Sequence, residues 1–112
     1  MAWFGGFTIE TYNRIPGDYE DVTVGVSAVG LSSTKIAPVT GPYARLSARA
    51  ALISSENGDI RFRIDGGLAS TSSGHYLTSG DTLVLTGTQA IQQFRAIRSG
   101  DTDGVLRVTY FY

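Results

Sequence analysis

The chain has 112 residues, no cysteine and a formal net charge of −1, which predicts one domain without disulfides or thiolate metal sites. With no basic excess and no apolar run of the ~20 residues that cross a membrane, it is expected to bind neither nucleic acid nor a membrane. Charged residues are 17% of the chain, against a usual ~25%, and this deficit favours a protein that covers part of its surface with a partner.

The N-terminal half predicts two short strands, at residues 7–12 and 22–29, because both runs are rich in residues that favour strands. Residues 15–18 are expected to form a turn around a Pro-Gly pair. Pro38 and Pro42 bracket an irregular passage or an edge strand, since proline cannot donate to a sheet ladder. Helical signals are almost absent, because 14 glycines and 3 prolines leave few stretches for a helix of ~11 residues.

The middle of the chain predicts a β-hairpin. Residues 44–54 form a long run rich in Ala, Leu and Ile, and Asn57-Gly58 supplies the two positive-φ residues that a tight hairpin turn requires. The returning run alternates, which is typical of a strand with one buried face. Its predicted inward side chains are Ile60, Phe62 and Ile64, with Arg61 and Arg63 on the other face.

The C-terminal half predicts three further strands, at residues 82–86, 92–98 and 105–112. Residues 65–80 are expected to be a loop dense in Gly, Ser and Thr, with a short apolar interruption at 76–77, and residues 99–104 a turn. Alternation predicts one face of the last strand with Leu106, Val108, Tyr110 and Tyr112, and places Phe94 and Ala96 opposite Arg95 and Ile97.

The whole pattern predicts seven or eight short strands at regular spacing, which favours an all-β sandwich or barrel. We expect the strands to be antiparallel. No linker, low-complexity tract or repeat divides the chain, so residues 1–112 are expected to form a single domain.

No set of catalytic, cofactor-binding or metal-ligating residues is predicted. The only histidine, His75, is interpreted as a loop residue that hydrogen-bonds the backbone. Asp101 and Asp103 resemble part of a calcium loop, but the closing glutamate is missing and turn chemistry explains both residues. A carboxylate-based enzyme site on Asp65 or Asp81 is disfavoured, because each stands beside glycine in an expected turn.

Two features favour a binding surface. The chain has eight arginines and one lysine, and arginine is enriched at interfaces, although cross-strand ion pairs on a solvated sheet explain the pattern equally well. Consecutive aromatics in the last strand must point to both faces, so one side needs cover from a second sheet or another chain. The candidate interface residues are Trp3, Phe4, Arg61, Arg63, Arg95, Arg107, Tyr110, Phe111 and Tyr112.

A family resemblance rests on short motifs at residues 60–66, 74–77, 80–81, 94–97 and 108–112. Together they resemble small accessory structural proteins of tailed bacteriophages and prophages. The sequence departs from that pattern at residues 68–71, where such proteins tend to carry Pro-Thr, and the first half of the chain shows no likeness. The resemblance implies a jelly-roll-like β-sandwich in the virion, usually a symmetric oligomer, without catalytic residues or cofactors.

The leading hypothesis is a capsid decoration, or cementing, protein that binds and stabilises the assembled shell. The resemblance implies the major capsid protein or another virion protein as partner, a homo-oligomer, by analogy a trimer, and a place on the capsid surface. No secretory signal is visible, which agrees with assembly in the host cytoplasm. The alternative is a carbohydrate-binding or receptor-binding module, in which Trp3, Tyr12, Tyr43 and Tyr76 would stack on sugars.

Overall fold

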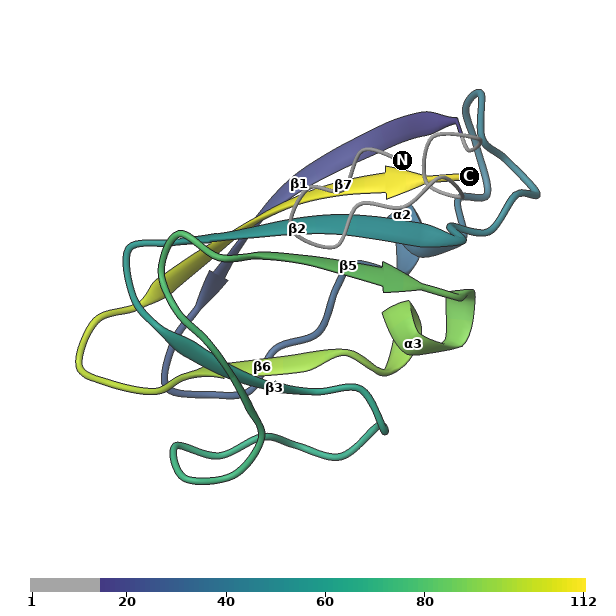
Figure 1. Cartoon of the computed structure of the whole chain (residues 1–112). Helices are drawn as coiled ribbons and strands as arrows, with labels where there is room; N and C mark the ends of the chain where they lie inside the picture. Colours follow the sequence, from purple (N-terminus) through teal and green to yellow (C-terminus); the bar gives the residue numbers. More distant parts are fainter. Residues whose placement is uncertain (1–14) are drawn as a thin grey trace, which may run out of the picture.

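Two antiparallel sheets face each other in the computed structural model, which describes residues 15–112 (Figure 1). The four-stranded sheet has the order β1-β7-β2-β5, with β1 (Pro16–Val24), β2 (Ala50–Glu56), β5 (Thr82–Thr86) and β7 (Gly104–Phe111). The three-stranded sheet has the order β4-β3-β6, with β3 (Ile60–Arg63), β4 (His75–Leu77) and β6 (Arg95–Arg98). Two short helices, α2 (Ser33–Ile36) and α3 (Thr88–Gln93), contact each other at one end. The expected all-β antiparallel sandwich is confirmed.

The strand pairs are nested, as in a jelly roll. β1 pairs with β7, β2 with β5, and β3 with β4, so the chain folds back on itself like one long hairpin rolled into two sheets. β6 pairs with β3 on one side, and on the other side with a single antiparallel bridge from Val29 to Ala96. This bridge occupies the place of the eighth strand of a jelly roll.

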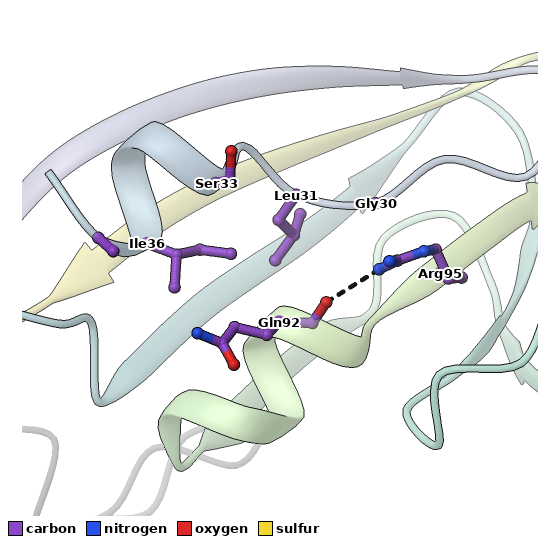
Figure 2. Close-up of a pocket in the computed structure, with 7 residues that line it drawn as sticks. Gly30, Leu31, Ser33, Ile36, Gln92 and Arg95 are labelled. Atoms are coloured by element: carbon purple, nitrogen blue, oxygen red, sulfur yellow. Dashed lines mark hydrogen bonds between the residues drawn. The ribbon is translucent and has the colours of Figure 1, made fainter.

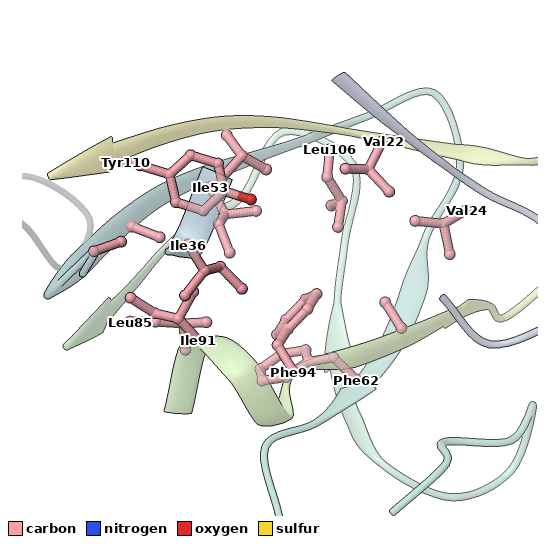
Figure 3. Close-up of a cluster of buried hydrophobic side chains, with 14 of the residues drawn as sticks. Val22, Val24, Ile36, Ile53, Phe62, Leu85, Ile91, Phe94, Leu106 and Tyr110 are labelled. Atoms are coloured by element: carbon pink, nitrogen blue, oxygen red, sulfur yellow. The ribbon is translucent and has the colours of Figure 1, made fainter. Parts of the chain in front are cut away.

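The core lies between the inner faces of the two sheets (Figure 3). Alternation along β7 turns Leu106, Val108 and Tyr110 inward, each with no exposed surface, as the sequence predicts. Phe62 of β3 and Phe94, which follows α3, stack with ring centroids 5.5 Å apart. Full burial of side chains of this size stabilises the fold by about 1.5–3 kcal/mol each. Because the chain has no cysteine, its stability depends on this packing and not on disulfides.

The predicted hairpin at Asn57-Gly58 is wrong. β2 and β3 lie in different sheets, and the segment between them turns the corner from one sheet to the other. Asn57 has a turn-like φ of +70°, but Gly58 is needed for a close approach, since a Cβ there would lie 2.3 Å from the carbonyl oxygen of Thr102. Both edges of β2 are occupied by β5 and β7, so β3 has no free edge beside it and joins the facing sheet.

Residues 16–18 form the start of β1, directly after Ile15, instead of the expected turn. Pro16 faces Phe111 in the register, and the carbonyl of Ile15 accepts a hydrogen bond from the Tyr112 amide at 2.9 Å. The register of β1 with β7 shifts between Pro16 and Tyr19, so the Gly17-Asp18 step forms an irregularity within the strand, while pairing on both sides of it keeps the segment in the sheet.

The strand expected at 22–29 is displaced, since β1 begins at Pro16 and ends at Val24. The strands expected at 44–54 and 92–98 are shorter than predicted, because β2 begins only at Ala50 and β6 only at Arg95. Two helices of 4 and 6 residues form where the sequence predicts none, and buried Ile36 and Ile91 hold them against the core. The predicted strand at 82–86 and the irregular passage between the two prolines are confirmed. The strand expected at 7–12 lies outside the described residues.

Part of the loop expected at 65–80 is a strand, β4, which includes the predicted apolar interruption. Its pairing with β3 extends the three-stranded sheet to that edge. The predicted inward alternation of β3 is confirmed at Ile60 and Phe62, whereas Ile64 lies beyond the strand and is 39% exposed.

Candidate functional site

The outer face of the three-stranded sheet carries three of the predicted interface arginines. Alternation along β3 turns its apolar residues into the core and its arginines outward. The register places Arg61 opposite Tyr76 of β4 and Ile97 of β6, and Arg63 opposite Arg95. We call these five residues the arginine surface: Arg61, Arg63, Tyr76, Arg95 and Ile97.

Arg61 is held by main-chain oxygens and an aromatic ring rather than by a carboxylate. Its Nε donates to the carbonyl oxygen of Thr71 at 3.1 Å, and its Nη1 to that of Gly74 at 3.1 Å. The guanidinium lies 5.0 Å from the ring centroid of Tyr76, a cation–π contact. All these partners are uncharged, so no ion pair within residues 15–112 neutralises this charge.

Arg95 is held in a similar way at the edge of the sheet (Figure 2). Its Nη1 donates to the carbonyl oxygens of Gln92 at 2.9 Å and Phe94 at 2.7 Å. Gly30 lies against it, and a Cβ at that position would come 2.8 Å from Nη1. Among the described residues, no carboxylate forms an ion pair with Arg95.

Arg63 is the arginine of this surface that already has a counter-ion. Its Nε donates to Oδ1 of Asp65 at 3.0 Å and its Nη2 to Oδ2 at 2.5 Å, a bidentate pair. Asp65 also accepts the amide of Gly67 at 3.1 Å. The guanidinium and this amide lower the pKa of the Asp65 carboxyl to about 2. Asp65 is thus explained as a partner of Arg63.

Arg107 lies on the other side of the molecule, on the outer face of the four-stranded sheet. Its Nη1 is 3.1 Å from Oδ1 of Asp21, and its Nε donates to Oε2 of Glu56 at 3.0 Å. The hydrogen bonds to Glu56 and Asp21 raise the pKa of Arg107 further above its usual range. The interpretation as a cross-strand ion pair therefore holds for Arg107, and this predicted interface residue is not part of the arginine surface.

Tyr110 has no exposed surface, so it belongs to the core instead of the expected interface. Its hydroxyl donates to Oε1 of Glu20, which also accepts the amide of Ser32 at 3.0 Å. Burial and the hydrogen bond to Glu20 raise the pKa of Tyr110 well above its usual value. The cause is the position of β7, which lies between β1 and β2 and turns alternate side chains toward the opposite sheet.

The other terminal aromatics of β7 are covered as well. Phe111 is 6% exposed and Tyr112 is 7% exposed. Tyr112 stacks on Tyr43 with ring centroids 4.6 Å apart, and burial raises its pKa to about 12. We therefore assign neither residue to an exposed interface. The remaining aromatic candidates, Trp3 and Phe4, lie outside the described residues.

Two hollows adjoin the arginine surface. One of about 490 Å³ lies between α2 and α3 and has Arg95 in its wall (Figure 2). The other, of about 290 Å³, lies at the loops before β3 and β7 and is lined by polar residues that include Asn57, Asp59, Tyr76 and Asp101. Asp59 accepts a hydrogen bond from the Tyr76 hydroxyl at 2.7 Å, which lowers the pKa of its carboxyl.

The residues considered for metal or acid–base chemistry do not form a ligand cluster among residues 15–112. His75 begins β4 instead of lying in a loop, and its ring packs against Phe62 with centroids 5.4 Å apart. Asp103 pairs with Arg98 at 2.7 Å. In the described part of the chain, no group of three or more His, Asp or Glu side chains is placed to hold a metal ion.

No protein-family model, curated protein or solved structure matches this chain. Neither helix in the described part is long or apolar enough to cross a membrane. The fold and the site together define a small jelly-roll domain whose three-stranded sheet carries two arginines, Arg61 and Arg95, that have no carboxylate partner within residues 15–112.

Proposed function

We propose that this chain is a virion structural protein of a tailed bacteriophage, and within that class a capsid decoration protein that stabilises the assembled major capsid protein shell. Two features support this: the resemblance of its C-terminal motifs, and a jelly roll of the kind found in viral capsid and lectin domains. The observation that carries the binding role is the state of Arg61 and Arg95. Both are held in place, yet neither has a carboxylate partner within residues 15–112.

The arginine surface suits an acidic protein partner. Guanidiniums that main-chain oxygens already orient lose little side-chain freedom when they pair, and they match carboxylates in a planar geometry. Arg63, whose charge is paired with Asp65, adds a polar rim to the contact. Tyr76, which is 50% exposed, and Ile97 contribute apolar surface between the charges.

Shell stabilisation follows if the partner surface exists only in the assembled lattice. A protein that binds the lattice and not its free subunits stabilises the lattice by mass action. We further propose a homo-oligomer, with a trimer as the working model, because several weak contacts on one particle add avidity. The proposed mechanism uses no cofactor.

Co-sedimentation with undecorated shells of the cognate phage tests this proposal. We expect the protein to sediment with shells at micromolar concentration, and the double variant R61Q/R95Q to bind at least ~10-fold more weakly, because two charge-assisted pairs are lost. Arg49→Gln is the matched control, since Arg49 is exposed and has no ion pair among the described residues. Wild-type protein that stays in the supernatant, or a double variant that binds equally well, contradicts the proposal.

The second candidate, a receptor-glycan module, is favoured by the polar hollow of about 290 Å³ beside Tyr76. Against it, the rings named for sugar stacking do not form a platform in the described residues: Tyr43 stacks on Tyr112, and Tyr76 lies under Arg61. The other two rings, Trp3 and Tyr12, lie outside those residues. Binding on a glycan array that is lost in Asp59→Asn and kept in R61Q/R95Q would favour the glycan module over shell decoration.

A further inference from the structure

The hollow between α2 and α3 combines an apolar floor with one oriented cation (Figure 2). Leu31 and Ile36 form the apolar part, and Ile36 is only 3% exposed. Ser33, Gln92 and Arg95 supply the polar wall. At about 490 Å³ the hollow falls within the ~300–1,000 Å³ of typical ligand pockets, so it has room for a polar group together with an apolar one.

The guanidinium of Arg95 offers a defined binding edge. A guanidinium has five N–H donors, and Nη1 directs its two hydrogens at the carbonyl oxygens of Gln92 and Phe94. Nε and Nη2 have no hydrogen-bond partner among residues 15–112. Those two nitrogens form one of the planar forks that a carboxylate meets with two parallel hydrogen bonds.

The guanidinium of Arg95 packs directly against the backbone of Gly30. A Cβ at position 30 would come 2.8 Å from Nη1 of Arg95 and 3.2 Å from the carbonyl oxygen of Phe94. The backbone at 30 is kept in place by the neighbouring bridge, in which Val29 and Ala96 exchange two hydrogen bonds of 2.8 Å. A glycine here therefore permits the orientation that Arg95 has.

We infer that this hollow is a socket for an acidic side chain, Asp or Glu, of a protein partner, with an apolar residue next to it packing on Leu31 and Ile36. Charge complementarity argues for the acid, because Arg95 is a cation without a counter-ion in the described chain. Continuity argues for a protein segment, because Arg95 belongs both to the hollow and to the arginine surface. The inference rests on the proposed function and names the partner chemistry that it requires.

An NMR titration of the full, isotope-labelled chain with the dipeptide acetyl-Glu-Leu-amide tests the socket. We expect shifts of the Gly30 and Ile36 amides and of the Arg95 Nε–H, with affinity about 10-fold weaker for acetyl-Gln-Leu-amide. Arg95→Gln should weaken acetyl-Glu-Leu-amide by the same factor, and Arg49→Gln should not. Gly30→Ala is the second variant: it keeps the charge but displaces the guanidinium, and should weaken binding as well.

Several results would overturn the socket. Equal affinity for the two peptides, or unchanged affinity in Arg95→Gln, would show that the guanidinium does not recognise the acid. Succinate that binds as tightly as acetyl-Glu-Leu-amide would indicate a free acid as the ligand instead of a protein segment. Self-association that Arg95→Gln abolishes would assign the hollow to a second copy of the chain and would also overturn it.

The shell experiment separates the two proposals. Peptide binding that depends on Arg95, together with wild-type protein that ignores shells, supports the socket and rejects shell decoration. Shell binding that is unaffected by Arg95→Gln and lost in Arg61→Gln supports decoration and rejects the socket.

Discussion

The arginines compared on the outer faces of the two sheets, Arg107 on one and Arg61 and Arg95 on the other, have different hydrogen-bond partners. On the four-stranded sheet, Arg107 lies between Asp21 and Glu56 and joins three neighbouring strands through ion pairs. On the three-stranded sheet, Arg61 and Arg95 are held by carbonyl oxygens. A carbonyl satisfies a donor but leaves the net charge in place. On the first face Arg107 therefore has two carboxylate counter-ions, whereas on the second face Arg61 and Arg95 keep positive charge that a partner can neutralise.

Strand length explains much of this difference. The strands of the four-stranded sheet have 9, 7, 5 and 8 residues, and long neighbours bring side chains of three strands into one row. The strands of the three-stranded sheet have only 4, 3 and 4 residues. The loop between β3 and β4 folds back toward the arginines, so its carbonyls at Leu68, Thr71 and Gly74 take the place of cross-strand carboxylates.

The largest expected effect comes from the buried tyrosine–carboxylate hydrogen bond of the four-stranded sheet, compared with the exposed one of the three-stranded sheet. Tyr110→Phe removes the buried hydroxyl that donates a hydrogen bond to Glu20. This change should lower the free energy of unfolding by about 2 kcal/mol, because the Glu20 carboxylate is left with fewer partners. Tyr76→Phe removes the exposed hydroxyl that donates a hydrogen bond to Asp59. It should lower the free energy of unfolding by only a small fraction of the loss in Tyr110→Phe. Urea denaturation of both variants measures the difference. Equal losses would mean that the two sheets do not differ in this respect.

A smaller effect is expected at alkaline pH. The pKa of Tyr112 is raised to about 12 by burial and by the charge of Asp18, and that of Tyr110 is raised as well. Tyrosine in the unfolded chain ionises near ~10, so the unfolded state loses its protons first. Stability is then complete below pH ~10 and falls as pH rises toward 12. Urea midpoints at pH 9, 10 and 11 should show this fall, with a shallower slope in Tyr112→Phe.

The ion pairs of Arg107 should contribute modestly and in a salt-dependent way. Arg107→Gln should lower Tm by about 3 °C at low ionic strength and by less in 1 M NaCl, where exposed pairs are screened. Arg95→Gln loses two hydrogen bonds to neutral carbonyls but no ion pair within the described chain, so the change in its Tm should be the same at both salt concentrations. Calorimetry at two salt concentrations measures both. A loss of Tm in Arg95→Gln that shrinks in 1 M NaCl as much as that in Arg107→Gln would contradict the contrast between the two faces.

The smallest expected effect on stability belongs to Asp65, whose carboxyl has its pKa lowered to about 2 by Arg63 and the Gly67 amide. A lowered pKa means that this stabilisation is present above pH ~4 and is lost as pH falls toward 2. Carbon-detected NMR should show Asp65 titrating near 2, and nearer to its usual ~3.9 in Arg63→Gln. Titration at the usual value in the wild type would contradict the bidentate pair.

Local pattern predicted some elements closely. The strand at 82–86 and the inward face of β7 follow from alternation, which is a property of neighbouring residues. Local sequence could not show whether residues 57–58 close a hairpin, because a hairpin there requires a free edge on β2, and both edges are occupied by β5 and β7. Helices α2 and α3 were also beyond the sequence signal, since helices this short are stabilised by packing of Ile36 and Ile91 rather than by propensity.

The candidate site was partly visible. Alternation in residues 60–64 indicates outward arginines at 61 and 63, and Arg95 was among the interface candidates. The hollow beside Arg95 is not visible in the sequence, because its walls come from residues 30–37 and from Gln92 and Arg95, two segments that are far apart in the chain. Tyr110 shows the opposite error: it is among the interface candidates, whereas the opposite sheet covers it completely together with Leu106 and Val108.

The sequence by itself determined the all-β class and the sides of β3, β6 and β7 that face the core, because period-two alternation is a property of adjacent residues. Only the tertiary structure decided which strands pair, which corner Gly58 turns and which arginines have a counter-ion. Those features depend on distances between residues far apart in the chain, and edge occupancy and charge pairing are set by the whole fold.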